Sequence, residues 1–333
     1  MRAPTFWIVR EGRDSAPVLR LLLSPLGWLY GASVAYRMAT TVPTKVAIPV
    51  ISIGNISAGG TGKTPLAQLL RGLLADELGG LVAIVSRGYG GMLKGPVRVD
   101  TEVHRAQDVG DEPLMLAHDG PVFIAKDRAQ AGQLAAQSGM AGLILDDAHQ
   151  NPNLEKNLSL VVVDGNVGFG NGRLIPAGPL REPPARGLAR TDGVIVMGAL
   201  SEDARDDLSC YHGPVFHAEL ATGPIDFKGP VLGFCGIGRP EKFDISLREA
   251  GLDVVDLHPF GDHHVYRDHE LKRLECLAKQ AGAQLVTTAK DYVRLPIDFA
   301  RKVRVLPVTV RLSDPEAFLA FLCAKLDTHS RRD

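Results

Sequence analysis

The sequence predicts an α/β fold with a parallel sheet, a second, smaller α/β domain and an N-terminal amphipathic helix. Three observations predict it. Short apolar runs alternate with helical stretches from residue 46 onward, a glycine-rich loop joins one run to a helix at residues 57–64, and an uncharged stretch lies near the N-terminus. Apolar runs separated by helices are typical of parallel strands that are covered on both faces.

Length and charge limit the possible functions. The chain has 333 residues, a length that suits two domains better than one core. Its 37 basic and 38 acidic residues leave a net charge of -1. General nucleic-acid binding needs an excess of cations, so we expect no nucleic-acid partner, and no protein partner is predicted. The four cysteines lack the short spacing of a zinc or redox motif, which favours reduced thiols in the cytosol.

Residues 1–45 form a separate, basic N-terminal segment. Within it, Leu21–Tyr36 carries no charge but contains a proline and two glycines. The run is shorter than the roughly 20 apolar residues that span a membrane, and it starts too late for a signal peptide. Two alternatives stay open. Trp28, Tyr30 and Tyr36 suit an interfacial helix at headgroup level, and the same pattern suits a helix packed on its own protein.

Residues 46–212 are expected to form the larger domain. We expect ligands at the carboxyl ends of its strands, as in other open parallel sheets. Its predicted strands are Ala47–Ile53, Leu81–Val85, Val122–Ala125, Ala141–Leu145, Leu158–Val163 and Gly193–Met197, and its predicted helices are Lys63–Leu78 and Asp127–Ser138.

Residues 213–333 are expected to form the smaller domain, because Ser201–Lys228 mixes charge, glycine and proline as a linker does. Its predicted strands are Pro230–Phe234, Leu252–Leu257, Gln284–Thr287 and Val303–Val310, and its predicted helices are Pro240–Ala250, Asp268–Ala281 and Pro315–Leu326.

The glycine-rich loop has the context of a phosphate-binding P-loop, because it follows a strand and opens a helix. Its residues are Ser57, Ala58, Gly59, Gly60, Thr61, Gly62, Lys63 and Thr64. Backbone N–H groups and the helix N-terminus would hold phosphate oxygens, Lys63 would reach the β- and γ-phosphates, and Thr64 would hold Mg²⁺. Ser57 stands where the usual pattern has glycine, and the alternative is a turn without a ligand. We predict ATP and Mg²⁺ here, and hence a P-loop kinase-like domain.

Two acidic turns and one histidine pair could complete such a site. Asp146 and Asp147 end an apolar strand beside the loop and are candidate metal ligands, although a helix cap would look the same. Gly110–Pro113 is a second acidic turn, which could equally begin a helix. The pair in Asp262–His264 could be a surface loop, or one histidine could work with a carboxylate from the other domain.

Together these motifs resemble those of the tetraacyldisaccharide 4'-kinase (lipid A 4'-kinase) family. The similar segments run in order from about residue 15 to about residue 310. They are Gly54–Pro65, Ser86–Gly90, Gly110–Pro113, Gly170–Pro183, Gly233–Pro240 and Asp262–His263.

The resemblance implies a reaction and a location. It implies transfer of the γ-phosphate of ATP to the 4'-hydroxyl of an acylated glucosamine disaccharide 1-phosphate, which gives lipid IVA. It implies a peripheral enzyme on the inner-membrane lipid surface, at the cytoplasmic face. The smaller domain would close over the active site and exclude water.

The resemblance also implies roles for individual residues. Asp111 would be the base, acting with His263, while Lys63 would stabilise the transferred phosphate. Glu112 would lie near Mg²⁺ together with Thr64. Arg181 would bind the sugar 1-phosphate, and Gln150 would bind substrate.

One segment departs from the family pattern. Residues 146–151 read Asp-Asp-Ala-His-Gln-Asn, where the family usually reads Asp-Asp-Gly-Phe-Gln-His. Ala148 lacks the freedom of glycine at positive φ, so the resemblance leaves the local turn open.

Two alternative functions remain from the sequence. One is a P-loop ATPase or GTPase that acts as a switch or metal-insertion factor. The other is a non-catalytic, membrane-associated binding protein. The first would not need the arginine-bearing loop of residues 176–183 or a lipid-facing N-terminal segment, and the second would bind lipid without transferring phosphate.

Overall fold

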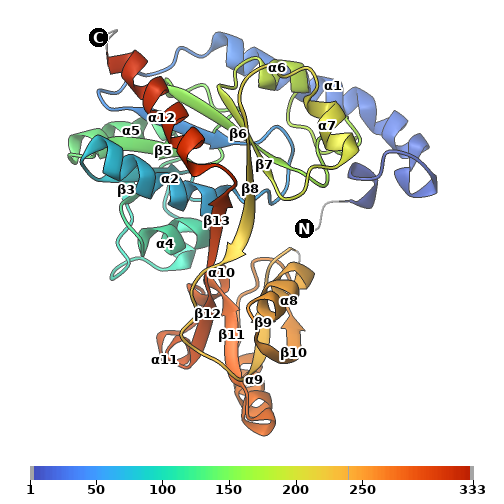
Figure 1. The fold of residues 1–333 in the computed structure, drawn as a ribbon, viewed down its shortest axis with the longest axis vertical. Helices are drawn as coiled ribbons and strands as arrows, with labels where there is room; N and C mark the ends of the chain where they lie inside the picture. The colour runs from blue at the N-terminus through green and yellow to red at the C-terminus, as the bar shows by residue number, and fades with distance from the viewer. Residues whose placement is uncertain (1–3, 239, 331–333) are drawn as a thin grey trace.

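A computed structural model describes residues 4–238 and 240–330 and shows a larger and a smaller unit, each built on one sheet (Figure 1). In spatial order, the sheet of the larger unit comprises β13 (Val308–Leu312), β8 (Val215–Thr222), β7 (Gly193–Met197), β6 (Leu158–Asp164), β1 (Val50–Gly54), β5 (Gly142–Leu145), β2 (Val82–Ser86), β4 (Val122–Ile124) and β3 (Val97–Arg98).

The centre of this sheet is parallel, and antiparallel pairs occur only at its two edges, β13 with β8 and β3 with β4. Strands β1, β2 and β5 are buried along their whole length, as their continuous apolar sequences require. The expected parallel sheet is therefore confirmed. Strand β1 begins at Val50 and not at Ala47, because Pro49 has no N–H to donate to a neighbour.

Helices cover both faces of the sheet. Those of the larger unit are η1 (Thr5–Trp7), η2 (Arg13–Ser15), α1 (Pro17–Thr40), α2 (Lys63–Leu78), α3 (Ala106–Val109), α4 (Asp111–Ala117), α5 (Arg128–Gln137), α6 (Pro184–Leu188), α7 (Glu202–Leu208) and α12 (Pro315–Ser330). Leucines of α2 pack with Ile51 on one face, and alanines of α5 pack with Val50 on the other. This opposition follows from the two-residue period of a strand.

Helix α1 has 24 residues and runs through Pro25, so it is longer than the uncharged run from which it was expected. Its inward face carries small and polar residues, together with the buried Arg20. Its outward face carries large apolar side chains, among them Leu21, Leu22, Leu26, Trp28, Leu29 and Tyr36. By length and composition, residues 13–40 could cross a membrane.

The inward face holds α1 close to the loop that follows β6. A Cβ atom on Gly27 or Gly31 would press against Leu174, so these glycines allow a close approach of helix and loop. Arg173 also donates to the Ser24 hydroxyl at 3.0 Å. The helix is therefore packed on the protein along one side.

The smaller unit is a four-stranded parallel sheet with helices on both faces. In spatial order its strands are β10 (Asp253–Pro259), β9 (Pro230–Cys235), β11 (Gln284–Thr288) and β12 (Val303–Leu306), and its helices are α8 (Pro240–Glu249), α9 (Asp268–Ala281), α10 (Ala289–Tyr292) and α11 (Ile297–Ala300).

The strand pairing does not follow the expected boundary at residue 212. The predicted strand Val303–Val310 is two strands separated by Pro307, and the second of them, β13, returns to the larger sheet beside β8. Helix α12 follows β13 and packs Phe318 into the core of the larger unit. The smaller sheet is thus an insertion between β8 and β13, and it hangs below them in Figure 1.

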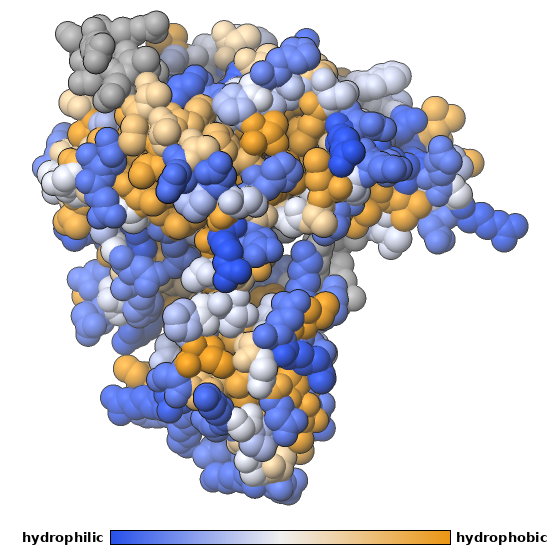
Figure 2. Space-filling view, in the orientation of Figure 1, coloured by the Kyte–Doolittle hydropathy of each residue, from blue (hydrophilic) through white to orange (hydrophobic). Residues whose placement is uncertain are grey.

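Both units carry hydrophilic and hydrophobic residues on the face seen in Figure 2. In Figure 2 the lower end of the smaller unit is covered largely by hydrophilic residues. Hydrophobic residues reach the surface at the upper right, where Figure 1 places α1.

Candidate active site

The glycine-rich loop lies between β1 and α2, as expected for a phosphate-binding turn. Gly62 caps α2 with φ +80°, and Gly59 has φ +141°, conformations that favour glycine. The Cβ positions of Gly59 and Gly60 meet no atoms within 4 Å, which leaves room for a ligand beside the backbone. Ser57, the departure from the usual pattern, instead pairs with Leu180 of the loop that follows β6.

The first acidic turn lies beside this loop, because β5 pairs directly with β1. Asp147 lies 3.8 Å from Lys63 Nζ and 2.8 Å from Arg181 Nη1, both through its Oδ1. The positive φ of this turn, +49°, falls at Asp147 and not at the next residue. Ala148 is buried in the core, so alanine fits where the family has glycine.

The pKa values of the two carboxylates in this turn are shifted in opposite directions. Burial, followed by the charge of Glu112, raises the pKa of Asp146 to about 6. Burial alone would also raise the pKa of Asp147, but Lys63 and Arg181 outweigh it and hold that pKa below its usual value. Burial disfavours the charged form of the neighbouring His149 as well, and for a histidine this lowers the pKa, here to about 3, so the imidazole is neutral.

The second acidic turn is the N-terminus of α4 and faces the smaller unit. Asp111 Oδ2 lies 2.8 Å from His263 Nδ1, and Glu112 forms an ion pair with Lys290. His263 has φ +56°, a strained conformation that is held by its N–H bond to the Gly236 carbonyl at 3.1 Å. The two units therefore meet at these carboxylates.

The adjacent histidine has a different environment. His264 Nε2 lies 2.9 Å from Glu270 Oε2, and its ring stacks on Phe260. Among the described residues, the contacts of His264 stay within the smaller unit, so His263 is the member of the pair that reaches the other unit.

A cavity of about 670 Å³ brings together the predicted site residues that lie outside the glycine-rich loop. Its walls include Asp111, Glu112, Asp146, Asp147, Gln150, Arg181 and His263. The residues of the glycine-rich loop are not on these walls, and Lys63 is joined to the group by its contact with Asp147. Asp147 of the first acidic turn is therefore the residue that links the glycine-rich loop to the cavity.

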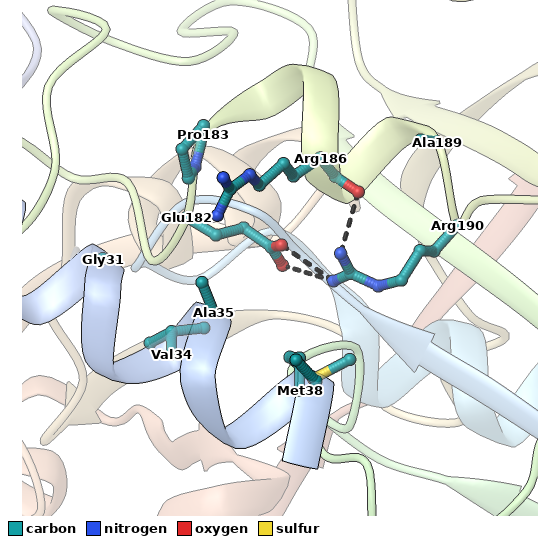
Figure 3. A pocket seen from close by; sticks show the side chains of 10 residues that line it. Gly31, Val34, Ala35, Met38, Glu182, Pro183, Arg186, Ala189 and Arg190 are labelled. Carbon is teal, nitrogen blue, oxygen red and sulfur yellow. Dashed lines mark hydrogen bonds and ion pairs between the residues drawn. The ribbon is translucent and has the colours of Figure 1, made fainter. Parts of the chain in front are cut away.

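Gln150 is fixed by groups on both sides of the site. Its Nε2 donates to the Asn55 carbonyl at 2.8 Å and to Glu182 Oε1 at 2.9 Å, which leaves Oε1 for a ligand. Glu182 is buried and is bound in turn by Arg190 through both carboxylate oxygens, as Figure 3 shows. The groove in that figure, of about 310 Å³, separates α6 from α1.

The cavity also contains side chains that the sequence analysis did not assign to the site. Arg87 and Lys126 follow the ends of β2 and β4, and Tyr30 and Arg37 come from α1. Arg128 donates to the carbonyls of Asp146 and Asp147 and so supports the first acidic turn. The carboxyl-end rule for parallel strands could have identified Arg87 and Lys126.

The acids could hold Mg²⁺, although two of them already have cationic partners. Asp146 Oδ1 is buried and has no hydrogen-bond partner among the described residues, as expected of a group that awaits a cation. Glu112 and Asp147, however, are each paired with a basic side chain. Within the described part of the chain, no three metal-ligating side chains are already clustered. Thr64 is buried at the first turn of α2, beside Lys63.

Comparisons with known proteins agree on one family. A family model described as tetraacyldisaccharide-1-P 4'-kinase matches residues 19–327. A tetraacyldisaccharide 4'-kinase from Maricaulis maris is 45% identical over 332 residues, which cover 98% of this chain and 97% of the relative. One from Caulobacter vibrioides is 47% identical over 328 residues, covering 96% and 97%.

A solved structure is similar over nearly the same extent. LpxK from Aquifex aeolicus in complex with ATP has a TM-score of 0.75 and 27% identity. The match covers 92% of this chain and 99% of that one.

Proposed function

This chain belongs to the tetraacyldisaccharide 4'-kinase family, and from that premise we propose how its residues divide an ATP-dependent phosphate transfer to a lipid A precursor. The observation that carries the assignment of roles is the meeting of both acidic turns, Arg181 and His263 on one cavity. The alternative of a P-loop switch is not favoured, because the family match extends across both units.

Ser57–Thr64 hold the triphosphate. The open backbone at Gly59 and Gly60 and the start of α2 suit phosphate oxygens. Lys63 lies near enough to Asp147 to be oriented by it, and its ammonium group balances the charge that spreads over the transferred phosphate.

Thr64, Glu112, Asp146 and Asp147 are the residues that would hold Mg²⁺. When bound, the ion neutralises charge on the β- and γ-phosphate oxygens. The unpartnered oxygen of Asp146 supports this assignment, and Lys290 would have to yield its place beside Glu112.

Asp111 accepts the proton of the 4'-hydroxyl as that oxygen bonds to the γ-phosphorus and the bond to ADP breaks. A sugar hydroxyl is a weak nucleophile, so a nearby proton acceptor accelerates attack. His263 Nδ1, 2.8 Å from Asp111 Oδ2, orients the carboxylate as it accepts the proton.

Arg181 and Gln150 bind the acceptor. The guanidinium of Arg181 matches a phosphate oxygen pair, and Arg87 and Lys126 on the same cavity add positive charge for the sugar 1-phosphate. Tyr30 and Arg37 extend this surface onto α1, where the acyl chains of the acceptor would emerge.

Helix α1 rests on the cytoplasmic face of the inner membrane as a peripheral anchor. Its outward face is apolar, whereas its inward face is bound to Leu174 and Arg173, which argues against a span. Replacing Leu29 by Glu should weaken sedimentation with anionic vesicles, whereas Val265→Glu, an exposed site on the smaller unit, should not. Equal binding by both variants and the native chain would argue against this anchor.

Single-turnover transfer from radiolabelled ATP to the acylated disaccharide 1-phosphate tests the proton acceptor. Asp111→Asn should slow transfer by about 10²- to 10⁴-fold, and His263→Ala should slow it less. His264→Ala is the matched control, because its partner is Glu270, and it should retain nearly the native rate. Near-native rates in both Asp111→Asn and His263→Ala would exclude the pair.

A further inference from the structure

The Asp111 carboxylate receives a second group from the smaller unit besides His263. Arg294 Nε lies 2.9 Å from Asp111 Oδ2, the same oxygen that His263 approaches. We propose that Arg294 is a positioning residue for the reaction: it holds Oδ2 so that Oδ1 is the oxygen presented to the acceptor hydroxyl. The inference rests on the proposed role of Asp111 as proton acceptor.

Arg294 is held by backbone carbonyls of the smaller unit as well as by its contact with Asp111. Its side chain is only 6% exposed, and its Nε donates to the Lys290 carbonyl at 3.1 Å. Its Nη1 donates to the His264 carbonyl at 3.2 Å, and its Nη2 to the Gly236 carbonyl at 3.4 Å. A side chain with all three nitrogens committed offers a rigid contact, as precise positioning requires.

A buried carboxylate stands behind Arg294. Asp291 is fully buried, and its Oδ1 lies 3.4 Å from Arg294 Nη1. The same carboxylate accepts from the Tyr266 hydroxyl at 2.7 Å, the Gly236 N–H at 2.8 Å and the Thr288 hydroxyl at 2.6 Å. Burial and this anion raise the pKa of Tyr266, which therefore stays a donor. Arg294 is thus a cation shared between two carboxylates, one from each unit.

A purely structural role would explain only part of this arrangement. The contacts with Gly236, His264 and Asp291 already engage both Nη atoms of the guanidinium within the smaller unit. The contact with Asp111 is additional and crosses to α4. Among the described residues, both ion pairs of Asp111 fall on Oδ2 and none on Oδ1. The carboxylate is therefore held by one oxygen and left open at the other.

The experiment is a double-mutant cycle in single-turnover phosphate transfer by the full chain. Arg294→Gln should lower the rate at saturating substrates by about 10- to 100-fold, the loss typical of a misplaced catalytic group, while the KM values for ATP and acceptor change less than about threefold. Arg294→Lys, which keeps a cation, should recover part of the rate. In combination with Asp111→Asn, Arg294→Gln should cause no further loss.

Tyr266→Phe is the matched structural control, because it removes one bond from Asp291 and leaves the contacts of Asp111 intact. It should lower the melting temperature and keep a near-native rate. Should Arg294→Gln fail to fold, Arg294→Lys carries the cycle in its place. Additive losses in the double variant, or an equal loss in Tyr266→Phe, would overturn the inference. A near-native Asp111→Asn rate would instead remove the proposed proton acceptor itself.

Discussion

The two acidic turns of the site are built in different ways. Asp146 and Asp147 are held by Lys63, Arg181 and Arg128, which all belong to the larger unit. The carboxylates of Asp111 and Glu112 are held instead by His263, Arg294 and Lys290 of the smaller unit.

This difference separates two tasks. The first turn is assembled within one unit and needs no domain contact, which suits the binding of a nucleotide and its metal ion. The second turn has its charged partners only when the two units meet, which suits a proton acceptor that should act on a bound acceptor and not on water.

Among the side chains that pair with the two turns, Lys63 should give the largest effect, because Lys63→Ala removes the cation that lies beside Asp147 and, as proposed, the transferred phosphate. We expect a loss of about 10³-fold in kcat/KM, because one preorganised cation at the transferred phosphate is removed. ATP binding should weaken as well, which equilibrium dialysis can measure. A loss below about tenfold would mean that the glycine-rich loop does not carry the transferred phosphate.

Substitutions of Glu112 and of Lys290 should change the Mg²⁺ requirement of the enzyme in opposite directions. Glu112→Gln should raise the Mg²⁺ concentration for half-maximal rate several-fold, because a metal-ligating oxygen loses its charge. Lys290→Ala should lower that concentration, because it removes the cation that competes for Glu112. Magnesium titrations of the two variants decide the matter: an increase in both would show that the ion pair itself is needed between the units.

Arg181→Lys should produce a smaller effect, which is confined to binding of the acceptor. The KM for the acylated disaccharide 1-phosphate should rise by about tenfold, because lysine cannot form the paired contact of a guanidinium with phosphate. The KM for ATP should stay nearly native. Asp147→Asn is the companion variant, because it removes the 2.8 Å partner of Arg181 and reports how much of any change passes through that carboxylate.

The smallest effect concerns the stability of the first turn. The folded chain holds a proton on Asp146 up to about pH 6, above the ordinary value of 3.8, so this residue lowers the free energy of unfolding as pH rises between these values. Asp146→Asn removes the buried charge and should be about 1–3 kcal/mol more stable than the native chain at pH 8 without Mg²⁺, but little different near pH 4. Urea unfolding at both pH values would show this, and a destabilised variant at pH 8 would contradict it.

Much of the fold could be predicted because the central strands are buried on both faces. A short, continuous apolar run such as Leu158–Val163 is typical of a parallel strand, and the helix Asp268–Ala281 was predicted at its observed bounds. The edges were harder. Strand β8 has mostly exposed or half-buried positions and lies within a charged stretch, so it was not predicted. The split at Pro307 was missed because residues 303–310 read as one apolar run.

The candidate site also contains residues that the sequence could locate and residues that it could not. Asp146 and Asp147 could be located because strand ends have a fixed place in a parallel sheet. The turn at Ala148 stayed open on the family pattern alone, and the positive φ lies one residue earlier. Arg294 and Lys290 carry no local signal, because their partners lie in the other unit and only the folded chain brings them together.

The smaller unit is joined to the larger one through two neighbouring strands, β8 and β13. Val308 of β13 pairs directly with Thr222 of β8, so the chain leaves and re-enters the sheet edge at one point. A two-residue Asn-Gly turn could bridge that point as an ordinary hairpin. One continuous segment, residues 223–307, therefore carries all three described side chains of the smaller unit that contact Asp111 and Glu112.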